Sequence, residues 1–287
     1  MSSSPEVEKL IQLLDLEQIE INLFRGFNSD KKRVRVFGGQ VLGQALVAAG
    51  RTVEDREPHS FHGYFLRPGN PDMPIIYEVD RIRDGRSFTT RRVVAIQNGK
   101  AIFNMSSSFQ VVEKGLEHHF DMPAATPPEE LETEEIQLKT LFKSDPDNYK
   151  PSDYFDWPIE FRHVSKGHSK RSDKHSPHNM VWFRATDALP DDPMLHKCVL
   201  AYASDHGLLA TALLPHGISI DNKQLQAASL DHAMWFHHEF RADEWLLYVQ
   251  DSPSSSSGRG FCRGSIYNRD GLLVASVTQE GLIRHWD

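Results

Sequence analysis

The sequence is poor in cysteine, with only Cys198 and Cys262 in 287 residues, and it has no run of about 18 uninterrupted apolar residues. Two cysteines cannot build a disulfide framework, so we interpret both as reduced thiols that are buried like small hydrophobic side chains. Without a long apolar run, we expect no membrane-spanning helix.

Targeting signals and excess positive charge are also lacking. The N-terminal segment MSSSPEVEKL is acidic and has no apolar core, and the C-terminal IRHWD is not an SKL-type address, so we expect a cytoplasmic protein. The 32 Lys and Arg residues are outnumbered by 40 Asp and Glu residues, for a net charge of −8. This balance argues against nucleic acid or an anionic membrane as partner, because neutralising phosphates requires a surplus of cations.

A repeat is the clearest organisation in the chain. The segment HSFHGYFLRPG at 59–69 resembles AASLDHAMWFHHEF at 227–240, and aligning His62 with His232 gives an offset of 170. Farther on, aligning Gly99 with Gly271 gives an offset of 172. We therefore predict an N-terminal repeat at 1–122, a Pro-rich acidic linker at 123–155 with a helix-like part at 134–142, and a C-terminal repeat at 156–287.

Each repeat is predicted to place one apolar helix before several strands. After a short helix that begins at Ser4-Pro5, the small and apolar residues of 41–50 predict a buried helix that a sheet can approach closely on more than one side. Four strands in hairpin order are expected near 59, 75, 89 and 101. The dipeptides Asn98-Gly99 and Asp270-Gly271 predict type I′ hairpin turns.

The second half repeats this plan. Asp192-Pro193 begins a predicted helix that continues to 214, and strands are expected from 227, 245, 261 and 272, with the Ser-rich 251–260 as a flexible loop. The segment 163–178 contains four histidines, at 163, 168, 175 and 178, among lysines and serines. We interpret it as a solvated basic loop rather than a metal site, because it has no acidic or cysteine partner cluster.

An apolar helix wrapped by a curved antiparallel sheet, present twice in one chain, is the plan of a double hotdog, an α+β fold. Six motifs occur in order, and together they resemble the acyl-CoA thioesterase II family over nearly the whole chain. These motifs are FGGQVLGQAL, HSFHGYFLRPG, AIQNGKAIF, ASDHGLLATALLPHG, SLDHAMWFH and VTQEG.

The resemblance implies a catalytic site made of Asp205, Ser229 and Gln279, which would hydrolyse fatty acyl-CoA by direct attack of an activated water. Such a reaction needs a proton acceptor, a held water and donors for the developing oxyanion. It needs no metal and no organic cofactor, and the implied partner is the acyl-CoA substrate. A homodimer or homotetramer is also expected, because hotdog sheets expose long edges.

Each of these residues also has a purely structural interpretation, since the Asp could cap a loop and the Ser and Gln could satisfy strand edges. In the aligned repeat, His59 occupies the position equivalent to Ser229, and Ser107 occupies the position equivalent to Gln279. Only the second half is therefore expected to be active. The matching His62 and His232 are interpreted as structural, hydrogen-bonded within the sheets. Ser229 lacks a G-x-S-x-G elbow, which argues against a nucleophilic serine.

Two alternatives remain open at this point. Asp191 and His196, five residues apart at a helix start, are loosely similar to the Asp and His of hotdog enoyl-CoA hydratases and dehydratases. A non-catalytic acyl-CoA-binding protein would keep a groove for acyl-CoA but would not need the polar residues Asp205, Ser229 and Gln279. Release of free thiol from an acyl-CoA distinguishes the three functions.

Overall fold

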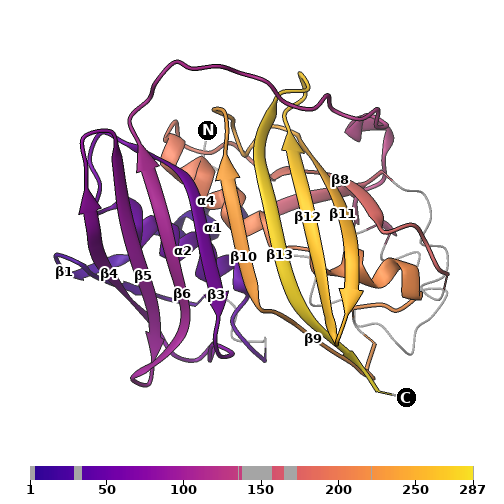
Figure 1. The fold of residues 1–287 in the computed structure, drawn as a ribbon, viewed down its shortest axis with the longest axis horizontal. Helices are drawn as coiled ribbons and strands as arrows, with labels where there is room; N and C mark the ends of the chain where they lie inside the picture. Colours follow the sequence, from indigo (N-terminus) through magenta and orange to yellow (C-terminus); the bar gives the residue numbers. More distant parts are fainter. Residues whose placement is uncertain are drawn as a thin grey trace.

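A computed structural model describes residues 4–28, 34–134, 136–137, 157–164, 173–220 and 222–286. The described strands form one 13-stranded antiparallel sheet, and the helices α1, α2 and α4 lie on one face of it (Figure 1). This is the α+β arrangement that the sequence predicts. None of the helices within these ranges is long and apolar enough to cross a membrane.

The chain passes twice through the same order of a hairpin, a helix and four strand positions, and in the second pass β9 and β10 together occupy the position of β3. The first pass consists of β1 (Glu17–Glu20), β2 (Leu23–Gly26), α2 (Gly38–Gly50), β3 (Glu57–Phe65), β4 (Ile75–Asp84), β5 (Phe88–Gln97) and β6 (Lys100–Gln110), preceded by α1 (Pro5–Leu14). The second consists of β7 (Ile159–His163), β8 (His178–Ala185), α4 (Pro193–Ser204), β9 (Leu225–Ser229), β10 (Asp231–Phe236), β11 (Leu246–Ser256), β12 (Arg259–Tyr267) and β13 (Leu273–His285). Two 3-10 helices, η1 (Pro128–Glu130) and η4 (Leu209–His216), complete the described elements.

The strand order is β1-β2-β4-β5-β6-β3-β10-β13-β12-β11-β8-β7, with β9 pairing β13 off this path. Strands β3 and β10 meet at the centre and join the two passes. The predicted hairpin order is wrong at β3, which pairs with β6 rather than β4. The opening hairpins β1-β2 and β7-β8 were not predicted, because β1 is polar and exposed throughout and β7 and β8 flank the polar His-rich segment.

Helix α2 is buried on nearly every side, as its apolar and small residues predict. Its closest neighbour is a helix rather than the sheet that was expected to approach it. A Cβ atom added at Gly39 would lie 2.1 Å from the backbone oxygen of Tyr202 in α4, so only glycine permits this contact. The first turn of α2 is therefore held against the end of α4.

Helix α1 begins as predicted, with Ser4 accepting a hydrogen bond from the Val7 N–H and Pro5 at the first helical position. Cys198 and Cys262 are free and buried, as expected, and burial raises the pKa of both thiols. The predicted helix at 134–142 lies mostly outside the described residues, and so does the predicted boundary at 155. The division into 1–122, 123–155 and 156–287 therefore stays a prediction.

The second central helix is shorter than predicted. Helix α4 ends at Ser204, with Asp205 as its C-cap, and Gly207 follows with a φ of 77°. A residue in the left-handed region ends a helix, and glycine adopts that conformation without strain. The apolar run from 208 continues as the separate helix η4.

The Ser-rich segment is strand rather than flexible loop, so that prediction was wrong. Strand β11 runs to Ser256 and pairs with β12 on both sides of a bulge between Asp251 and Ser254. The turn is confined to Ser257-Gly258, with φ values of 50° and 71°. The small serines fit an edge of the ladder as readily as a loop. At Asn98-Gly99, φ values of 50° and 68° confirm the predicted turn, whereas Asp270-Gly271 has a positive φ only at Gly271, so a type I′ turn there is excluded.

Strand pairing corrects the repeat by one residue. In the first half Phe61 pairs with Ser107, and in the second half Ala233 pairs with Thr278. With bulges at equivalent places, these pairs align β3 with β9 and β10 at an offset of 171 (232 − 61). They align β6 with β13 at an offset of 172 (279 − 107). Because a one-residue slip moves every side chain to the other face, the position equivalent to His232 is Phe61 rather than His62.

Gly264 in β12 provides a stability test of this packing. A Cβ atom added there would lie 2.1 Å from Cε2 of Tyr248, a fully buried ring. Gly264→Ala is expected to lower the free energy of unfolding by about 1–3 kcal/mol through overpacking. Thermal and urea unfolding measure the change, and Gly115→Ala, where the added atom meets nothing within 4 Å, is the control expected to stay near the wild type. Equal stability of the two variants would contradict this packing.

Candidate active site

The structure brings Asp205, Ser229 and Gln279 together in one hydrogen-bonded group. Gln279 Nε2 lies 2.7 Å from Asp205 Oδ1 and 2.9 Å from Ser229 Oγ, and Ser229 Oγ lies 3.3 Å from the same Asp205 oxygen. The three residues come from the C-cap of α4, the last position of β9 and the middle of β13. They are far apart in sequence but form a single polar cluster at the junction of these elements.

The direction of each hydrogen bond follows from the carboxylate, which only accepts. Gln279 must donate an N–H to Asp205, so its amide nitrogen is the atom that faces the carboxylate. The Ser229 hydroxyl donates its single proton to Asp205 and accepts the second N–H of Gln279. Gln279 is fully buried, whereas Asp205 and Ser229 are half-buried and are the two members that a substrate can reach.

The second carboxylate oxygen of Asp205 faces the start of α2. A Cβ atom added at Gly38 would lie 2.6 Å from Asp205 Oδ2 and 3.1 Å from Cζ of Phe65, so glycine lets this oxygen approach the helix backbone closely. Gly38 is the first residue of α2, and the first N–H groups of a helix have no acceptor within it. A carboxylate oxygen and the positive end of a helix dipole therefore lie side by side.

A bulge at the junction of β9 and β10 sets the position of Ser229. Ser229 is paired with Gly281, and after it the Leu230 N–H donates to the Glu280 backbone oxygen while Asp231 accepts the Glu280 N–H. The main ladder resumes at Ala233 opposite Thr278. The chain thus leaves β9 with Ser229 turned toward Asp205, while β10 continues beside β3.

The buried His232 also belongs to the surroundings of this cluster. Its Nε2 lies 2.9 Å from the Oγ of Ser204, the residue before Asp205, and its ring stacks on Phe61. Burial lowers the pKa of His232 to about 4, while the nearby Asp205 charge opposes the shift. The prediction that both histidines are hydrogen-bonded within the sheets is therefore wrong: His232 bonds to helix α4, and His62 is exposed and packs edge-on against Trp235.

The first half lacks an equivalent cluster. With the corrected register, the position of Ser229 is taken by Pro58 rather than His59, and that of Gln279 by Ser107, whose buried hydroxyl has no hydrogen-bond partner among the described residues. The C-cap of α2, which matches Asp205, is Arg51. Every polar member of the cluster is thus replaced by a different residue type in the first half.

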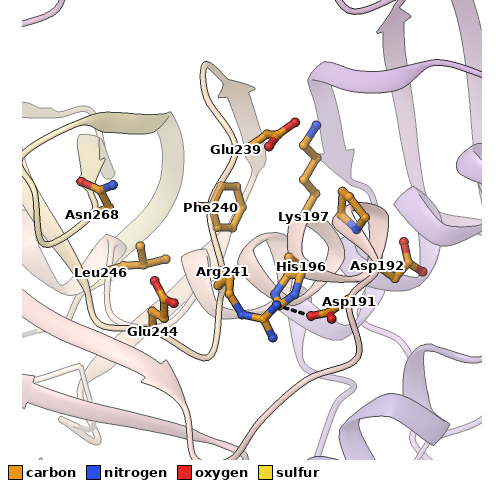
Figure 2. A pocket seen from close by; sticks show the side chains of 11 residues that line it. Asp191, Asp192, His196, Lys197, Glu239, Phe240, Arg241, Glu244, Leu246 and Asn268 are labelled. Atoms are coloured by element: carbon orange, nitrogen blue, oxygen red, sulfur yellow. Dashed lines mark hydrogen bonds and ion pairs between the residues drawn. The ribbon is translucent and has the colours of Figure 1, made fainter.

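The alternative pair Asp191 and His196 lies along a separate cavity of about 410 Å³ at the start of α4 (Figure 2). There the exposed Asp191 forms an ion pair with Arg241, and His196 Nδ1 accepts the backbone N–H of Ala242. The two side chains are thus paired with other residues rather than with each other, and His196 Nε2 is buried with no hydrogen-bond partner among the described residues. Among the residues that the structure describes, no group of three or more His, Cys, Asp or Glu is arranged to hold a metal.

Comparison with known proteins agrees with this architecture. A family model for the acyl-CoA thioesterase N-terminal domain matches residues 29–110, and one for acyl-CoA thioesterase matches residues 150–282. Human acyl-coenzyme A thioesterase 8 is 41% identical over 95% of this chain and 88% of its own. Acyl-CoA thioesterase 2 of Haemophilus influenzae is 39% identical over 97% of this chain and 98% of its own.

Among solved structures, the acyl-CoA thioesterase II TesB2 of Mycobacterium marinum superposes with a TM-score of 0.79 at 45% identity, over 96% of this chain and 98% of that one. The fold is therefore a double hotdog, as predicted. With relatives of this identity along almost its whole length, the chain belongs to the acyl-CoA thioesterase II family.

The lowered pKa of His232 predicts a pH-dependent stability. Its folded value of about 4 lies below the ordinary 6.5, so neutral His232 is favoured in the fold and the penalty for protonation develops as pH falls from about 6.5 to 4. His232→Gln cannot titrate. We expect the wild type to lose about 3 kcal/mol more free energy of unfolding than this variant between pH 7 and 4, measured by urea denaturation. Parallel losses would contradict a buried neutral His232.

Proposed function

We propose that this protein hydrolyses fatty acyl-CoA thioesters to the free fatty acid and CoA, with Asp205 activating a water molecule that attacks the thioester carbon. The observation that carries the proposal is the convergence of Gln279 and Ser229 on one oxygen of Asp205, which leaves the other oxygen beside the start of α2. The names of the family relatives support the substrate class.

In this mechanism Oδ2 of Asp205 is the proton acceptor. Oδ1 already receives hydrogen bonds from Gln279 and Ser229, so its lone pairs are occupied and its orientation is set. A water at Oδ2 lies next to the first turn of α2, whose free N–H groups stabilise a developing oxyanion. The water oxygen bonds to the thioester carbon, Asp205 takes the proton, and the C–S bond then breaks as the CoA sulfur leaves with that proton.

We assign different roles to the two supporting residues. Gln279 is fully buried and both its N–H groups are occupied, so we assign it the positioning of Asp205 and Ser229. Its amide oxygen is buried and has no hydrogen-bond partner among the described residues. Ser229 is half-buried and steadies the carboxylate from the substrate side. Its oxygen accepts the Gln279 N–H, which makes it a poorer nucleophile and favours water in that role.

The central test is Asp205→Asn, which preserves volume and removes the proton acceptor. Turnover should fall by at least about 10²- to 10³-fold while substrate binding and folding persist, because general-base catalysis alone accounts for a factor of this order. Release of free thiol from acyl-CoA, followed with a thiol reagent, measures the rate. Thiol release near the wild-type rate would overturn the assignment of the base.

Gln279→Ala and Ser229→Ala should slow the same step. The double variant Asp205→Asn with Gln279→Ala is expected to be little worse than the worse single variant, because groups that act as a unit are not additive. Ser107→Ala in the first half is the matched control and should leave kcat nearly unchanged. Equal damage from Ser107→Ala and Gln279→Ala would show that the site is not confined to the second half.

The space at Gly38 provides a separate test. Gly38→Ala places a methyl group 2.6 Å from Asp205 Oδ2, where the mechanism holds the attacking water. The methyl group would also lie 3.1 Å from Cζ of Phe65, so this ring must move by a few tenths of an ångström. Because alanine is favourable in a helix, we expect the fold to persist while kcat falls by about 10-fold or more. Circular dichroism and thiol release measure the two effects. A variant with full activity would exclude this side of the carboxylate as the position of the water.

The thiol assay also distinguishes the other functions. A hydratase would change the enoyl absorbance without thiol release, and a binding protein would do neither. No described contact favours either alternative, since Asp191 pairs with Arg241 and His196 Nδ1 accepts the Ala242 N–H, so the two are not paired with each other.

We further propose that the protein forms a homodimer or homotetramer. All four residues of the edge strand β1 are exposed, and Tyr64 and Phe88 expose large apolar surfaces, which favours burial between copies. Light scattering across micromolar dilution should give a dimer or tetramer mass, and a monomer mass throughout would contradict this. The proposal also includes a cytoplasmic location, to which the two free cysteines lend support.

A further inference from the structure

The residue before the proposed base is held by two side chains of the sheet. His232 in β10 lies 2.9 Å from the hydroxyl of Ser204, and the Tyr248 hydroxyl in β11 donates to the backbone oxygen of Ser204 at 3.2 Å. Ser204, His232 and Tyr248 are all buried. Because Ser204 is the last residue of α4, these two bonds fix the end of the helix from which Asp205 projects.

The hydrogen bonds determine which nitrogen of His232 carries the proton. Ser204 Oγ donates its only proton to the Ala201 backbone oxygen at 3.0 Å, so it can only accept from His232. His232 is therefore the neutral tautomer with the proton on Nε2, and its buried Nδ1 has no hydrogen-bond partner among the described residues. The ring acts on Ser204 through a single donated hydrogen bond.

The first half shows what the same positions contain when no proposed base is present. Tyr77 takes the position of Tyr248 at the offset of 171, and it too is fully buried. Phe61 takes the position of His232, and Gly50, the last residue of α2, takes that of Ser204. The tyrosine is thus common to both halves, whereas both partners of the Ser204–His232 bond occur only beside Asp205.

A phenylalanine can fill this inward position, because Phe61 occupies it in the first half with no exposed surface. A histidine there is less favourable for stability alone, because burial of an imidazole carries a desolvation penalty and leaves Nδ1 without a partner. Its presence in the second half therefore points to a task that Phe61 does not have. The task available to it in the structure is the bond to Ser204.

We propose that His232 is a positioning residue of the active site, which donates to Ser204 Oγ and thereby fixes the end of α4 so that Asp205 meets Ser229, Gln279 and the attacking water. This inference rests on the proposed function. It predicts that losing the donated hydrogen bond lowers kcat while KM for acyl-CoA stays nearly unchanged, because the residue acts on the base and not on substrate binding.

The decisive variant is His232→Phe, which installs the residue of the first half and retains a ring that stacks on Phe61. We expect kcat to fall by about 10- to 100-fold, as a small displacement of a catalytic group does, with KM changed less than about twofold and thermal stability unchanged or raised. Ser204→Ala should cause the same loss, and the double variant should be no worse. His62→Phe, on the exposed face of the neighbouring strand, is the matched control and should behave as the wild type.

The conservative variant separates positioning from packing. Glutamine carries its amide nitrogen about as far from the backbone as Nε2, so His232→Gln can still donate to Ser204 and should retain kcat within about threefold of the wild type. If His232→Phe is unstable, the two single variants Ser204→Ala and His232→Gln still test the inference, because the first should lose activity and the second should retain it. Wild-type kcat in both His232→Phe and Ser204→Ala would overturn it, and so would equal loss in His232→Phe and His232→Gln.

Failure of this inference is distinct from failure of the proposed function. No thiol release by the wild type, or normal release by Asp205→Asn, would reject the function itself. An inactive Asp205→Asn together with a fully active His232→Phe would reject only the role of His232.

Discussion

The close packing of α2 against α4 is the contact on which the site depends. Gly39 brings the first turn of α2 against the backbone of Tyr202, three residues before Asp205. Both helices are largely apolar and are covered by the sheet, so neither can move away without exposing core surface. This burial holds the positive end of one helix beside the carboxylate at the end of the other, in a place that neither half could form alone.

The two halves use the same framework for different purposes. Buried tyrosines at equivalent strand positions, Tyr77 and Tyr248, bind the two central helices through Gln44 and Ser204 respectively. In the second half, Asp205, Ser229, Gln279 and His232 donate or accept hydrogen bonds around the end of α4. In the first half the matching positions carry Arg51, Pro58, Phe61 and Ser107, and the buried hydroxyl of Ser107 has no hydrogen-bond partner among the described residues.

Much of the fold and the three proposed site residues could be predicted from the sequence, because the central helices, the main strands and the Asn98-Gly99 turn have strong local signals. The register could not. Both halves carry the same bulge, in β3 and at the junction of β9 and β10, and the turn between β12 and β13 is one residue longer than the turn between β5 and β6, which changes the offset from 171 to 172. Sequence spacing does not reveal where this extra residue falls. The Ser-rich end of β11 and the stop of α4 at Ser204 depend likewise on tertiary pairing. The bond between Ser204 and His232 was missed because the one-residue slip matched His232 with His62 instead of Phe61.

The account rests on direct attack by water rather than on an acyl-enzyme, and a single turnover in H₂¹⁸O with enzyme in excess tests this most directly. Mass spectrometry of the product and of the digested protein follows the label. Direct attack predicts a fatty acid that carries one solvent oxygen, an unlabelled Asp205 and no acyl group on Ser229. An unlabelled fatty acid with ¹⁸O in the Asp205 carboxylate, or an acyl adduct on Ser229, would contradict the account.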